Sequence, residues 1–418
     1  MEIKRDYYLR KLIDRRHNNL IKIVTGVRRC GKTYLLFNLF HDYLVENGIA
    51  QDHIIEIPLD DRSYKELRDP DQMLAFVKSK VSTDGAYYLM IDEIQLLPEF
   101  EDVLNSFLHI ANLDVYVSGS NSKLLSSDVI TEFRGRGDEV RVHPLCFREF
   151  MSVYDGSEEQ GWNEYFNYGG MPLVLSMKSY EDKADYLKSL FKKVYMTDIL
   201  ERHKIRNQEE METLVKVLAS AVGSLTNPRK LADTFKSRRQ AKVSQITLKK
   251  YCDYLEDAFL ITRVERYDIK GKKYISTPSK YYFEDIGLRN ARLNFRQQEE
   301  NHIMENIIFN ELCVRGYSVD VGIIEINERD KKGNGHRKQL EVDFVANKGS
   351  NRYYIQSAFM MNDEEKAAQE QRPLNKIPDS FTKVIVVRDN IIPYRNEQGI
   401  LVIGIRKFLL NEDSLDVY

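Results

Sequence analysis

The sequence has few cysteines and no long apolar run. Its four cysteines lie far apart without a CxxC pair, which argues against a disulfide framework and against a zinc site. No apolar run approaches the roughly 18 residues that span a bilayer, and the N-terminal segment MEIKRDYYLRKLIDRR lacks an apolar signal core. These absences predict a cytoplasmic protein with reduced cysteines and no membrane segment.

Neither sign of charge dominates the chain. The 62 Lys and Arg nearly balance the 64 Asp and Glu, for a formal net charge of -2. This balance excludes a globally basic nucleic-acid coat and an acidic disordered tail, although a basic face could still exist locally. The 418 residues, 42% of them hydrophobic, are enough for two to four domains.

The first third of the chain alternates short apolar runs with longer amphipathic stretches. Such alternation is typical of a parallel sheet covered by helices, so we expect an α/β fold. The predicted strands are Ile21–Val24, Ile54–Ile57, Tyr87–Ile91 and Val115–Val117. Residues 151–205 predict a helical linker or lid, residues 206–290 short helices followed by a hairpin, and residues 291–418 a long helix followed by strands.

A glycine-rich segment follows the first predicted strand and opens a helix. It fits the pattern GxxxxGK[ST] with the residues Gly26, Val27, Arg28, Arg29, Cys30, Gly31, Lys32 and Thr33. Backbone N–H groups of such a loop surround phosphate oxygens, assisted by the positive end of the helix. Lys32 is predicted to reach the β- and γ-phosphates, and the Thr33 hydroxyl to bind Mg²⁺. Cys30 occupies a variable position of the pattern and is interpreted as a small loop residue.

Two acids end the third predicted strand, as in a Walker B strand. In YYLMIDE, Asp92 is predicted to hold Mg²⁺ through water, and Glu93 to polarise the attacking water as general base. The next strand ends in small polar residues, among which Asn121, with Ser120 second, is the candidate to face the γ-phosphate. Capping of a following helix is the alternative for both residues.

Two arginines lie among glycines in the segment FRGRG. Arg134 or Arg136 could reach into the nucleotide site of a neighbouring subunit, where a guanidinium offsets charge on the transferred phosphoryl group. A plain solvated turn is the alternative. If either arginine acts in this way, the active unit is a homo-oligomer.

Together these motifs resemble those of AAA+ ATPases. More narrowly, the chain is similar to a bacterial and archaeal family that joins an AAA+ core to a winged helix and a C-terminal nuclease-like domain. The segments that carry the resemblance are GVRRCGKT, YLMIDEIQ, VSGSN, FRGRGDEVRVHPLCFREF, YGGMP and residues 227–288. The resemblance implies a P-loop AAA+ sheet in residues 1–150, a winged-helix domain in 206–290, a PD-(D/E)XK-like α/β domain in 291–418, and ATP and Mg²⁺ as ligands.

The predicted winged helix is basic. Residues 229–280 contain 14 Lys and Arg against 6 Asp and Glu, a net charge of +8. Ser244 is expected to cap a recognition-like helix that presents Lys249 and Lys250 to a DNA groove, with the hairpin at Gly271 as the wing. Phosphate contacts are expected from Arg238, Arg239, Lys250 and Lys272. Use of the winged helix as a lid or protein interface is the alternative.

Carboxylates in the C-terminal part resemble the metal site of PD-(D/E)XK nucleases. Glu305 lies on the long predicted helix, Asp343 on a strand, and Gln356 on the next strand. By resemblance these three match the metal-binding positions, but Ala358 stands where the family has its lysine. Lys366 is one substitute, and a degenerate, nucleic-acid-holding or structural domain is the alternative.

These observations predict an ATPase that uses hydrolysis to drive a conformational change on or near DNA. A signalling or scaffold switch with slow hydrolysis, and a nuclease gated by ATP, are the alternatives.

Overall fold

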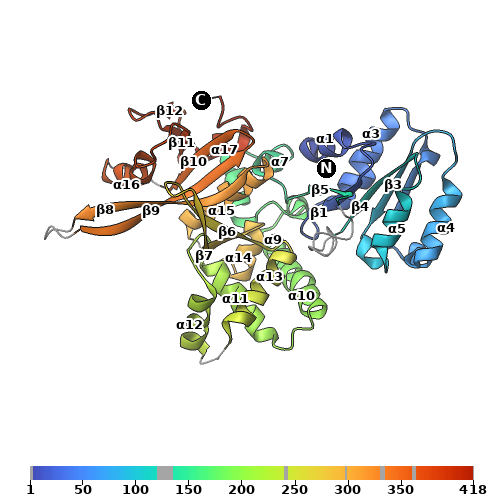
Figure 1. Cartoon of the computed structure of the whole chain (residues 1–418), viewed down its shortest axis with the longest axis horizontal. Helices are drawn as coiled ribbons and strands as arrows, with labels where there is room; N and C mark the ends of the chain where they lie inside the picture. The colour runs from blue at the N-terminus through green and yellow to red at the C-terminus, as the bar shows by residue number, and fades with distance from the viewer. Residues whose placement is uncertain are drawn as a thin grey trace. The chain divides into compact units, whose positions relative to one another are not determined.

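A computed structural model of the chain describes residues 3–119, 135–239, 243–296, 299–329, 335–359 and 364–417. The chain divides into two compact units (Figure 1). Unit 1 comprises residues 1–144 with 257–259, and unit 2 comprises residues 145–256 with 260–418. Among the described helices, none is long and apolar enough to cross a membrane. The four domains expected from the sequence stay a prediction.

Unit 1 contains a five-stranded parallel sheet with the order β2-β3-β4-β1-β5. The strands are β1 (Ile21–Thr25), β2 (Ile54–Pro58), β3 (Tyr87–Asp92), β4 (Leu113–Ser118) and β5 (Gly137–Arg141). Strand β1 lies between the central β4 and the edge strand β5, with Ile23 opposite Val117 and Glu139. The expected α/β fold with a parallel sheet is therefore confirmed.

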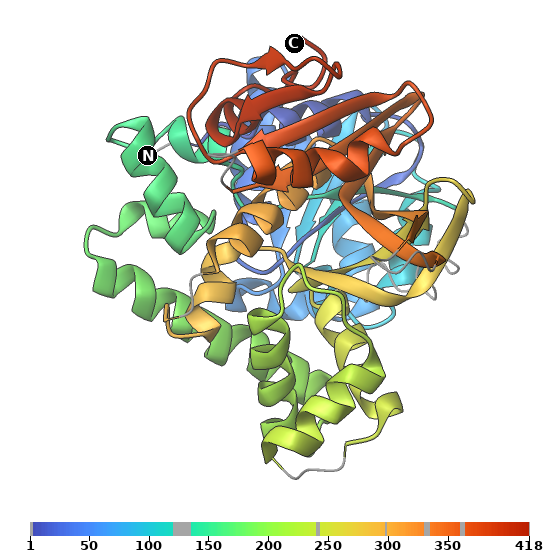
Figure 2. The same ribbon diagram turned by 90° about the vertical axis from the view of Figure 1, so that its left-hand side faces the viewer.

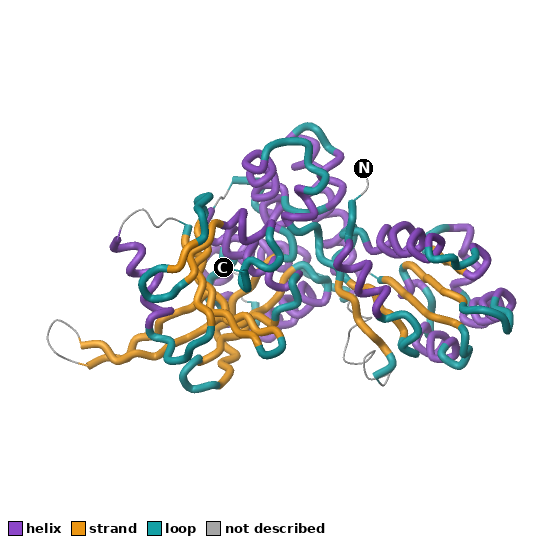
Figure 3. The backbone as a smooth tube through the Cα atoms, turned by 90° about the horizontal axis from the view of Figure 1, so that it is seen from above, coloured by secondary structure: helices purple, strands orange, loops and turns teal. Residues whose placement is uncertain are grey.

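Helices cover both faces of this sheet (Figure 3). On one face, apolar side chains of β1 to β4 form a buried core with α4 (Pro70–Lys80) and α5 (Phe100–Phe107). On the other face, the Phe40 ring lies 6.3 Å from the ring of Tyr88 and 4.6 Å from that of Tyr116. The helical elements of the unit are α1 (Asp6–Asp14), α2 (Lys32–Tyr34), the π-helical η1 (Leu35–Phe40), α3 (His41–Glu46), η2 (Gln51–His53), η3 (Arg62–Arg68), α4, η4 (Ile94–Leu96) and α5.

Unit 2 contains a mixed sheet of eight strands in the order β12-β13-β11-β10-β9-β8-β6-β7. The strands are β6 (Ile261–Asp268), β7 (Lys273–Phe283), β8 (Ser318–Arg329), β9 (Gly335–Lys348), β10 (Asn351–Ala358), β11 (Thr382–Val387), β12 (Tyr394–Arg395) and β13 (Leu401–Gly404). The β8–β9 hairpin extends beyond the rest of the sheet (Figures 1 and 3). The hairpin predicted as a wing forms as β6 and β7, and β6 pairs with β8, so the hairpin is the edge of the large sheet.

The helices of unit 2 lie before, between and, for the last of them, after these strands in the sequence. They are α7 (Phe147–Met151), α8 (Glu158–Tyr168), η6 (Pro172–Ser176), α9 (Tyr180–Ser189), the π-helical η7 (Leu190–Met196), α10 (Thr197–Arg202), α11 (Gln208–Ser220), α12 (Pro228–Arg239), α13 (Gln245–Asp257), α14 (Ile286–Arg292), α15 (Glu300–Val314), α16 (Glu364–Asn375) and α17 (Ile405–Leu410). Helices α11 to α13 form a group beside β7 and away from the last strands of the sheet (Figures 1 and 2).

The segment YGGMP is tied to the start of α14 by a buried carboxylate. Asp285 accepts a hydrogen bond from the N–H of Gly170 at 2.7 Å and one from the N–H of Leu288 at 2.9 Å. A Cβ on Gly170 would lie 2.0 Å from the Leu145 carbonyl oxygen, so only glycine fits there. The motif therefore joins segments that are more than a hundred residues apart in the sequence.

This buried carboxylate makes the stability of unit 2 depend on pH. Burial raises the pKa of Asp285 from 3.8 to about 6, although its backbone hydrogen bonds act in the opposite direction. Below about pH 4 both the folded and the unfolded chain hold the proton. Between about pH 4 and pH 6 the unfolded chain releases this proton while the folded chain keeps it, so we expect the free energy of unfolding to fall by up to about 3 kcal/mol over that range and to level off above it.

Asp285→Asn should remove this dependence, because the amide does not titrate. The free energy of unfolding can be followed between pH 4 and pH 7 by the fluorescence of Trp162, the single tryptophan, which lies on α8. The exposed Asp233→Asn, on α12 of the same unit, is the control and should keep the slope of the unchanged chain. An equal slope in the Asp285→Asn and unchanged chains would contradict the assignment.

Candidate functional site

The glycine-rich loop between β1 and α2 has the backbone shape that encloses an anion. Gly26 has φ +140°, and a Cβ there would lie 2.0 Å from the Val142 carbonyl oxygen. Gly31 precedes α2 with φ +103°, a left-handed conformation that glycine adopts at no steric cost. The two glycines therefore allow the loop to turn tightly, so that its backbone N–H groups can point toward an anion at the start of the helix.

The Lys32 side chain lies within this loop. Its Nζ donates hydrogen bonds to the carbonyl oxygens of Gly26 at 2.9 Å and Val27 at 3.1 Å, and the residue is buried. These are neutral acceptors that a negatively charged phosphate oxygen can replace, since hydrogen bonds between two charged partners are the stronger ones.

Asp92 gathers two hydroxyl groups at the carboxyl edge of the sheet. It ends β3, is buried, and accepts a hydrogen bond from Thr33 Oγ1 at 2.6 Å. The hydroxyl of Ser118, the last residue of β4, donates to the other carboxylate oxygen. A carboxylate and hydroxyl oxygens form the donor set that Mg²⁺ prefers, so these residues fit the expected metal.

Glu93 follows in an unusual backbone conformation. Its φ is +53°, which is uncommon for a residue with a side chain and tends to occur at functional sites. Its half-buried carboxylate accepts a hydrogen bond from the side-chain amide of Gln95. Gln95 is a contact that the sequence analysis did not identify.

A buried arginine outside the motif supports the phosphate loop. Arg5 donates hydrogen bonds to the carbonyl oxygens of Cys30 at 3.0 Å and His143 at 2.7 Å. Cys30 is also buried, and its thiol donates to the Val142 carbonyl oxygen at 3.3 Å, in keeping with a structural role. Two segments outside the motif, one at Arg5 and one at Val142, therefore hold the loop in place.

These side chains border a cavity of about 260 Å³. Its lining residues are Arg28, Arg29, Gly31, Lys32, Thr33, Tyr34, Asp60, Asp92 and Glu93. The structure therefore brings together the loop residues and the two acids that the sequence predicted, and it adds Asp60, which follows β2. A polar residue two positions after a strand of this sheet was the signal available for Asp60.

The other candidates from unit 1 are placed differently. Asn121, Ser120 and Arg134 lie outside the described residues. Arg136 is exposed, and its guanidinium donates to Asn105 Oδ1 at 3.3 Å.

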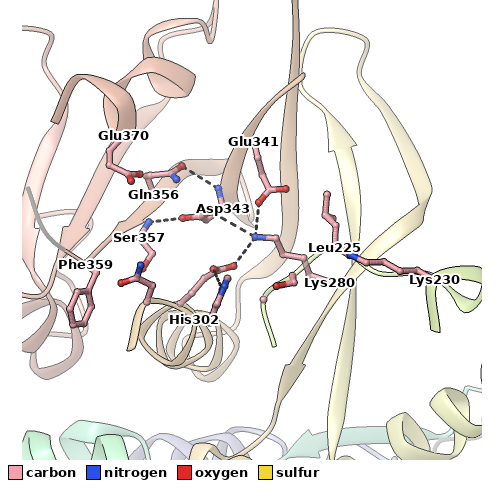
Figure 4. Close-up of a pocket in the computed structure, with 14 residues that line it drawn as sticks. Leu225, Lys230, Lys280, His302, Glu341, Asp343, Gln356, Ser357, Phe359 and Glu370 are labelled. Carbon is pink, nitrogen blue, oxygen red and sulfur yellow. Dashed lines mark hydrogen bonds and ion pairs between the residues drawn. The ribbon is translucent and has the colours of Figure 1, made fainter. Parts of the chain in front are cut away.

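A second cavity, of about 500 Å³, lies in unit 2 and contains the carboxylates predicted there (Figure 4). Glu305 of α15, Asp343 of β9 and Gln356 of β10 all line it. The Asp343 N–H lies 3.4 Å from Gln356 Oε1, and Asp343 Oδ2 accepts a hydrogen bond from the Ser357 N–H at 2.8 Å. The structure thus brings the three predicted residues together.

A lysine that the sequence analysis did not identify is at the centre of this cavity. Lys280 of β7 is buried, and its Nζ lies 2.8 Å from Glu305 Oε1, 2.7 Å from Glu341 Oε1 and 3.8 Å from Asp343 Oδ1. By contrast, Ala358 is buried and the side chain of Lys366 is exposed. No signal in the sequence connects Lys280 with this site, because it comes from the hairpin predicted as a wing.

Electrostatics in this cavity follow from burial and close charges. Burial by itself would lower the pKa of Lys280, but Glu305, Asp343 and Glu341 together raise it. Burial and then the charge of Glu305 raise the pKa of Asp343 well above its usual range. Burial favours a raised pKa for Glu305, but Lys280 and hydrogen bonds from His302 and Tyr282 lower it. The ammonium therefore stays charged beside Glu305, while Asp343 holds its proton more readily.

The basic segment of residues 229–280 is less positive at its surface than its sequence suggests. Lys280 is buried, Arg263 lies 3.6 Å from a carboxylate oxygen of Glu256, and Arg266 donates to the Thr277 carbonyl oxygen at 2.6 Å. Lys249 and Lys250 are exposed on α13.

The start of α13 is capped as expected. The Ser244 hydroxyl accepts a hydrogen bond from the Thr247 N–H at 3.0 Å. Lys272 is exposed in the turn between β6 and β7. The side chains of Arg238 and Arg239 lie outside the part of the chain that the structure describes.

Comparison with known proteins assigns the class of unit 1. A family model described as AAA domain matches residues 18–151, which contain the phosphate loop and the Walker B strand. A second one, described as domain of unknown function (DUF8612), matches residues 159–299. The chain therefore contains an AAA domain with the fold of AAA+ ATPases.

Relatives along most of the chain define the family. An uncharacterised protein of Haemophilus influenzae is 33% identical over 390 residues, which cover 92% of this chain and 93% of the relative. The chain belongs to the same family as that protein. Protein MJ1544 of Methanocaldococcus jannaschii is 28% identical over 91% of this chain and 83% of its own length. Among solved structures, the Aeropyrum pernix ORC1 protein in complex with DNA matches with a TM-score of 0.33 and 11% identity, over 72% of this chain and 94% of that chain.

Proposed function

We propose that unit 1 binds ATP with Mg²⁺ and hydrolyses it. The observation that carries this proposal is the convergence of Lys32, Thr33, Asp92 and Glu93 on one cavity at the carboxyl edge of a parallel sheet. This edge is where ligands bind in open α/β sheets. The AAA domain in residues 18–151 supports the proposal.

Each part of the site has a role in phosphate binding. The N–H groups of the loop and the start of α2 receive the phosphate oxygens, and Lys32 exchanges its two carbonyl acceptors for the β- and γ-phosphates. Asp92 and the Thr33 hydroxyl hold Mg²⁺. When bound, Mg²⁺ neutralises charge on the phosphates.

Glu93 is the general base that polarises the attacking water. It is the second acid at the end of β3 and lines the same cavity as Lys32. Accepting a proton from water in the transition state is the contribution that a positioned carboxylate makes to such a reaction.

A neighbouring subunit completes the site in this proposal. Arg136, or Arg134, offsets charge on the transferred phosphoryl group of the next copy, and Asn121, with Ser120 second, faces the γ-phosphate in its own chain. The exposure of Arg136 supports this role, because an arginine that acts in another subunit has to be accessible.

Hydrolysis drives a conformational change on or near DNA in the leading form of the proposal. Exposed Lys249 and Lys250 on α13 support contact with the DNA backbone, which requires accessible positive charge. We expect the protein to act as a homo-oligomer in the cytoplasm.

A switch with slow hydrolysis is the second candidate. The hydrogen bond from Gln95 to Glu93 favours it, because a general base that is held by its neighbour is less available to water. In this form, ATP binding sets the shape or assembly of the protein.

The rate of ATP hydrolysis with duplex DNA, with RNA and without nucleic acid tests the proposal. We expect Mg²⁺-dependent hydrolysis that duplex DNA accelerates. Replacing both Lys249 and Lys250 with Ala should abolish the acceleration and leave the basal rate unchanged. Lys192 and Lys193, also adjacent and exposed in unit 2, give the matched control pair.

The outcomes separate the candidates. Equal rates with and without nucleic acid would favour the switch over the DNA-directed machine. Absence of any hydrolysis, in a preparation that is shown to be folded, would refute the proposed activity.

A further inference from the structure

The cavity of unit 2 already contains a cation of the protein's own. Lys280 Nζ lies between carboxylates from two other elements, Glu305 of α15 and Glu341 of β9, at 2.8 and 2.7 Å (Figure 4). Tyr282, two residues further along β7, donates a second hydrogen bond to Glu305 at 2.6 Å. One edge strand therefore delivers both groups that contact Glu305 Oε1, and His302 of α15 lies 3.5 Å from Glu305 Oε2.

The resemblance to PD-(D/E)XK nucleases implies Mg²⁺ at Glu305, Asp343 and Gln356, and the arrangement of these residues tests whether they fit it. Mg²⁺ requires oxygen ligands at about 2.0–2.1 Å in near-octahedral geometry. Here the ammonium is in contact with Glu305 and 3.8 Å from Asp343, and Gln356 Oε1 faces the Asp343 N–H at 3.4 Å.

Within the described part of the chain, no group of three or more His, Cys, Asp or Glu has the geometry to hold a metal ion. A divalent ion placed between these carboxylates would also lie against the ammonium and be repelled by it. The residues do not fit the metal.

We propose that the Lys280 ammonium is the resident cation of this cavity and takes the place of a divalent metal. The lysine neutralises the carboxylates of α15 and β9 and fastens the β6–β7 hairpin to them. The unit is then not a metal-dependent nuclease. This inference does not depend on ATP binding by unit 1.

The proposal predicts that removal of the ammonium creates a metal site. Lys280→Met keeps most of the side-chain volume but leaves Glu305 and Glu341 without their cation. A buried carboxylate such as that of Glu305, once it loses its partner, either takes up a proton or binds a cation from solution, and the half-buried Glu341 remains beside it as a second ligand. We therefore expect Lys280→Met to bind Mn²⁺ on the order of 100-fold more tightly than the unchanged chain, since one positive charge at contact distance is lost.

Mn²⁺ titration of the full chain without nucleotide, followed by electron paramagnetic resonance, measures this difference. Any Mn²⁺ bound by unit 1 is common to both proteins and cancels. A double variant, Lys280→Met with Glu305→Gln, should lose the new site, because it removes one of the carboxylates. Lys230→Met is the matched control: Lys230 lines the same cavity, but its Nζ donates to the Leu225 carbonyl oxygen at 3.0 Å.

Two results would overturn the proposal. One is Mn²⁺ binding by the unchanged chain that weakens in Glu305→Gln. The other is a folded Lys280→Met chain that binds Mn²⁺ no better than the unchanged chain.

If Lys280→Met is too unstable to titrate, its melting temperature measured with and without Mn²⁺ is the alternative test of Mn²⁺ binding. A rise with Mn²⁺ in this variant alone supports the proposal, and no rise refutes it.

Discussion

Replacing Lys32 with Ala is expected to remove nucleotide binding. Lys32 is the cation whose Nζ lies within the phosphate loop, bonded to Gly26 and Val27. A hydrogen bond that involves a charged group is worth about 1.5–3 kcal/mol, and Lys32 is proposed to bond both the β- and the γ-phosphate. We expect ATP binding to weaken by on the order of 100-fold or more, and hydrolysis to fall below detection.

Binding of a fluorescent ATP analogue measures the effect, with thermal unfolding as the test of folding. Lys78→Ala is the matched control, because Lys78 is an exposed lysine of α4 in the same unit. Near-normal affinity in a folded Lys32→Ala chain would remove this loop from the nucleotide site.

Replacing Glu93 with Gln should separate binding from hydrolysis. The amide keeps the size of the side chain, so the cavity and its contacts to ATP remain. It cannot accept a proton, and general-base catalysis contributes about 10²–10⁴-fold to the rate. We expect hydrolysis to fall within that range while ATP affinity stays within about threefold of the unchanged chain.

Glu99→Gln is a closely matched control for this substitution. Glu99 is exposed and shares the left-handed backbone of Glu93, with φ +51° against +53°. Full turnover by the Glu93→Gln chain would remove Glu93 as the general base. An equal loss in Glu99→Gln would mean that the backbone of this segment, and not the carboxylate, controls the rate.

Most of unit 1 could be predicted from the sequence because its signals are local. The strands β1 to β4 are short apolar runs, and a nearly continuous apolar sequence is typical of parallel strands that are buried on both faces. The helix after the loop forms as expected, although six of its residues, Leu35–Phe40, are π-helical. Nothing in the local pattern indicates that change of hydrogen bonding.

The eight-stranded sheet could be predicted only in part. The β6–β7 hairpin has a recognisable turn, but its pairing with β8 joins residues that are about 55 positions apart, Arg266 and Val321. Such pairing depends on the edges that remain free once other strands have paired, so no local pattern specifies it.

The sequence by itself determined the phosphate loop and the Walker B acids, Gly26 to Thr33 with Asp92 and Glu93, because each motif needs neighbouring residues on one strand, turn or helix. Only the tertiary structure decided the support by Arg5, the hydroxyl of Ser118 on Asp92, and the place of Lys280 among the carboxylates of unit 2. These contacts join segments up to 138 residues apart, as between Arg5 and His143. Their geometry is set by the packing of whole elements, to which no spacing in the sequence corresponds.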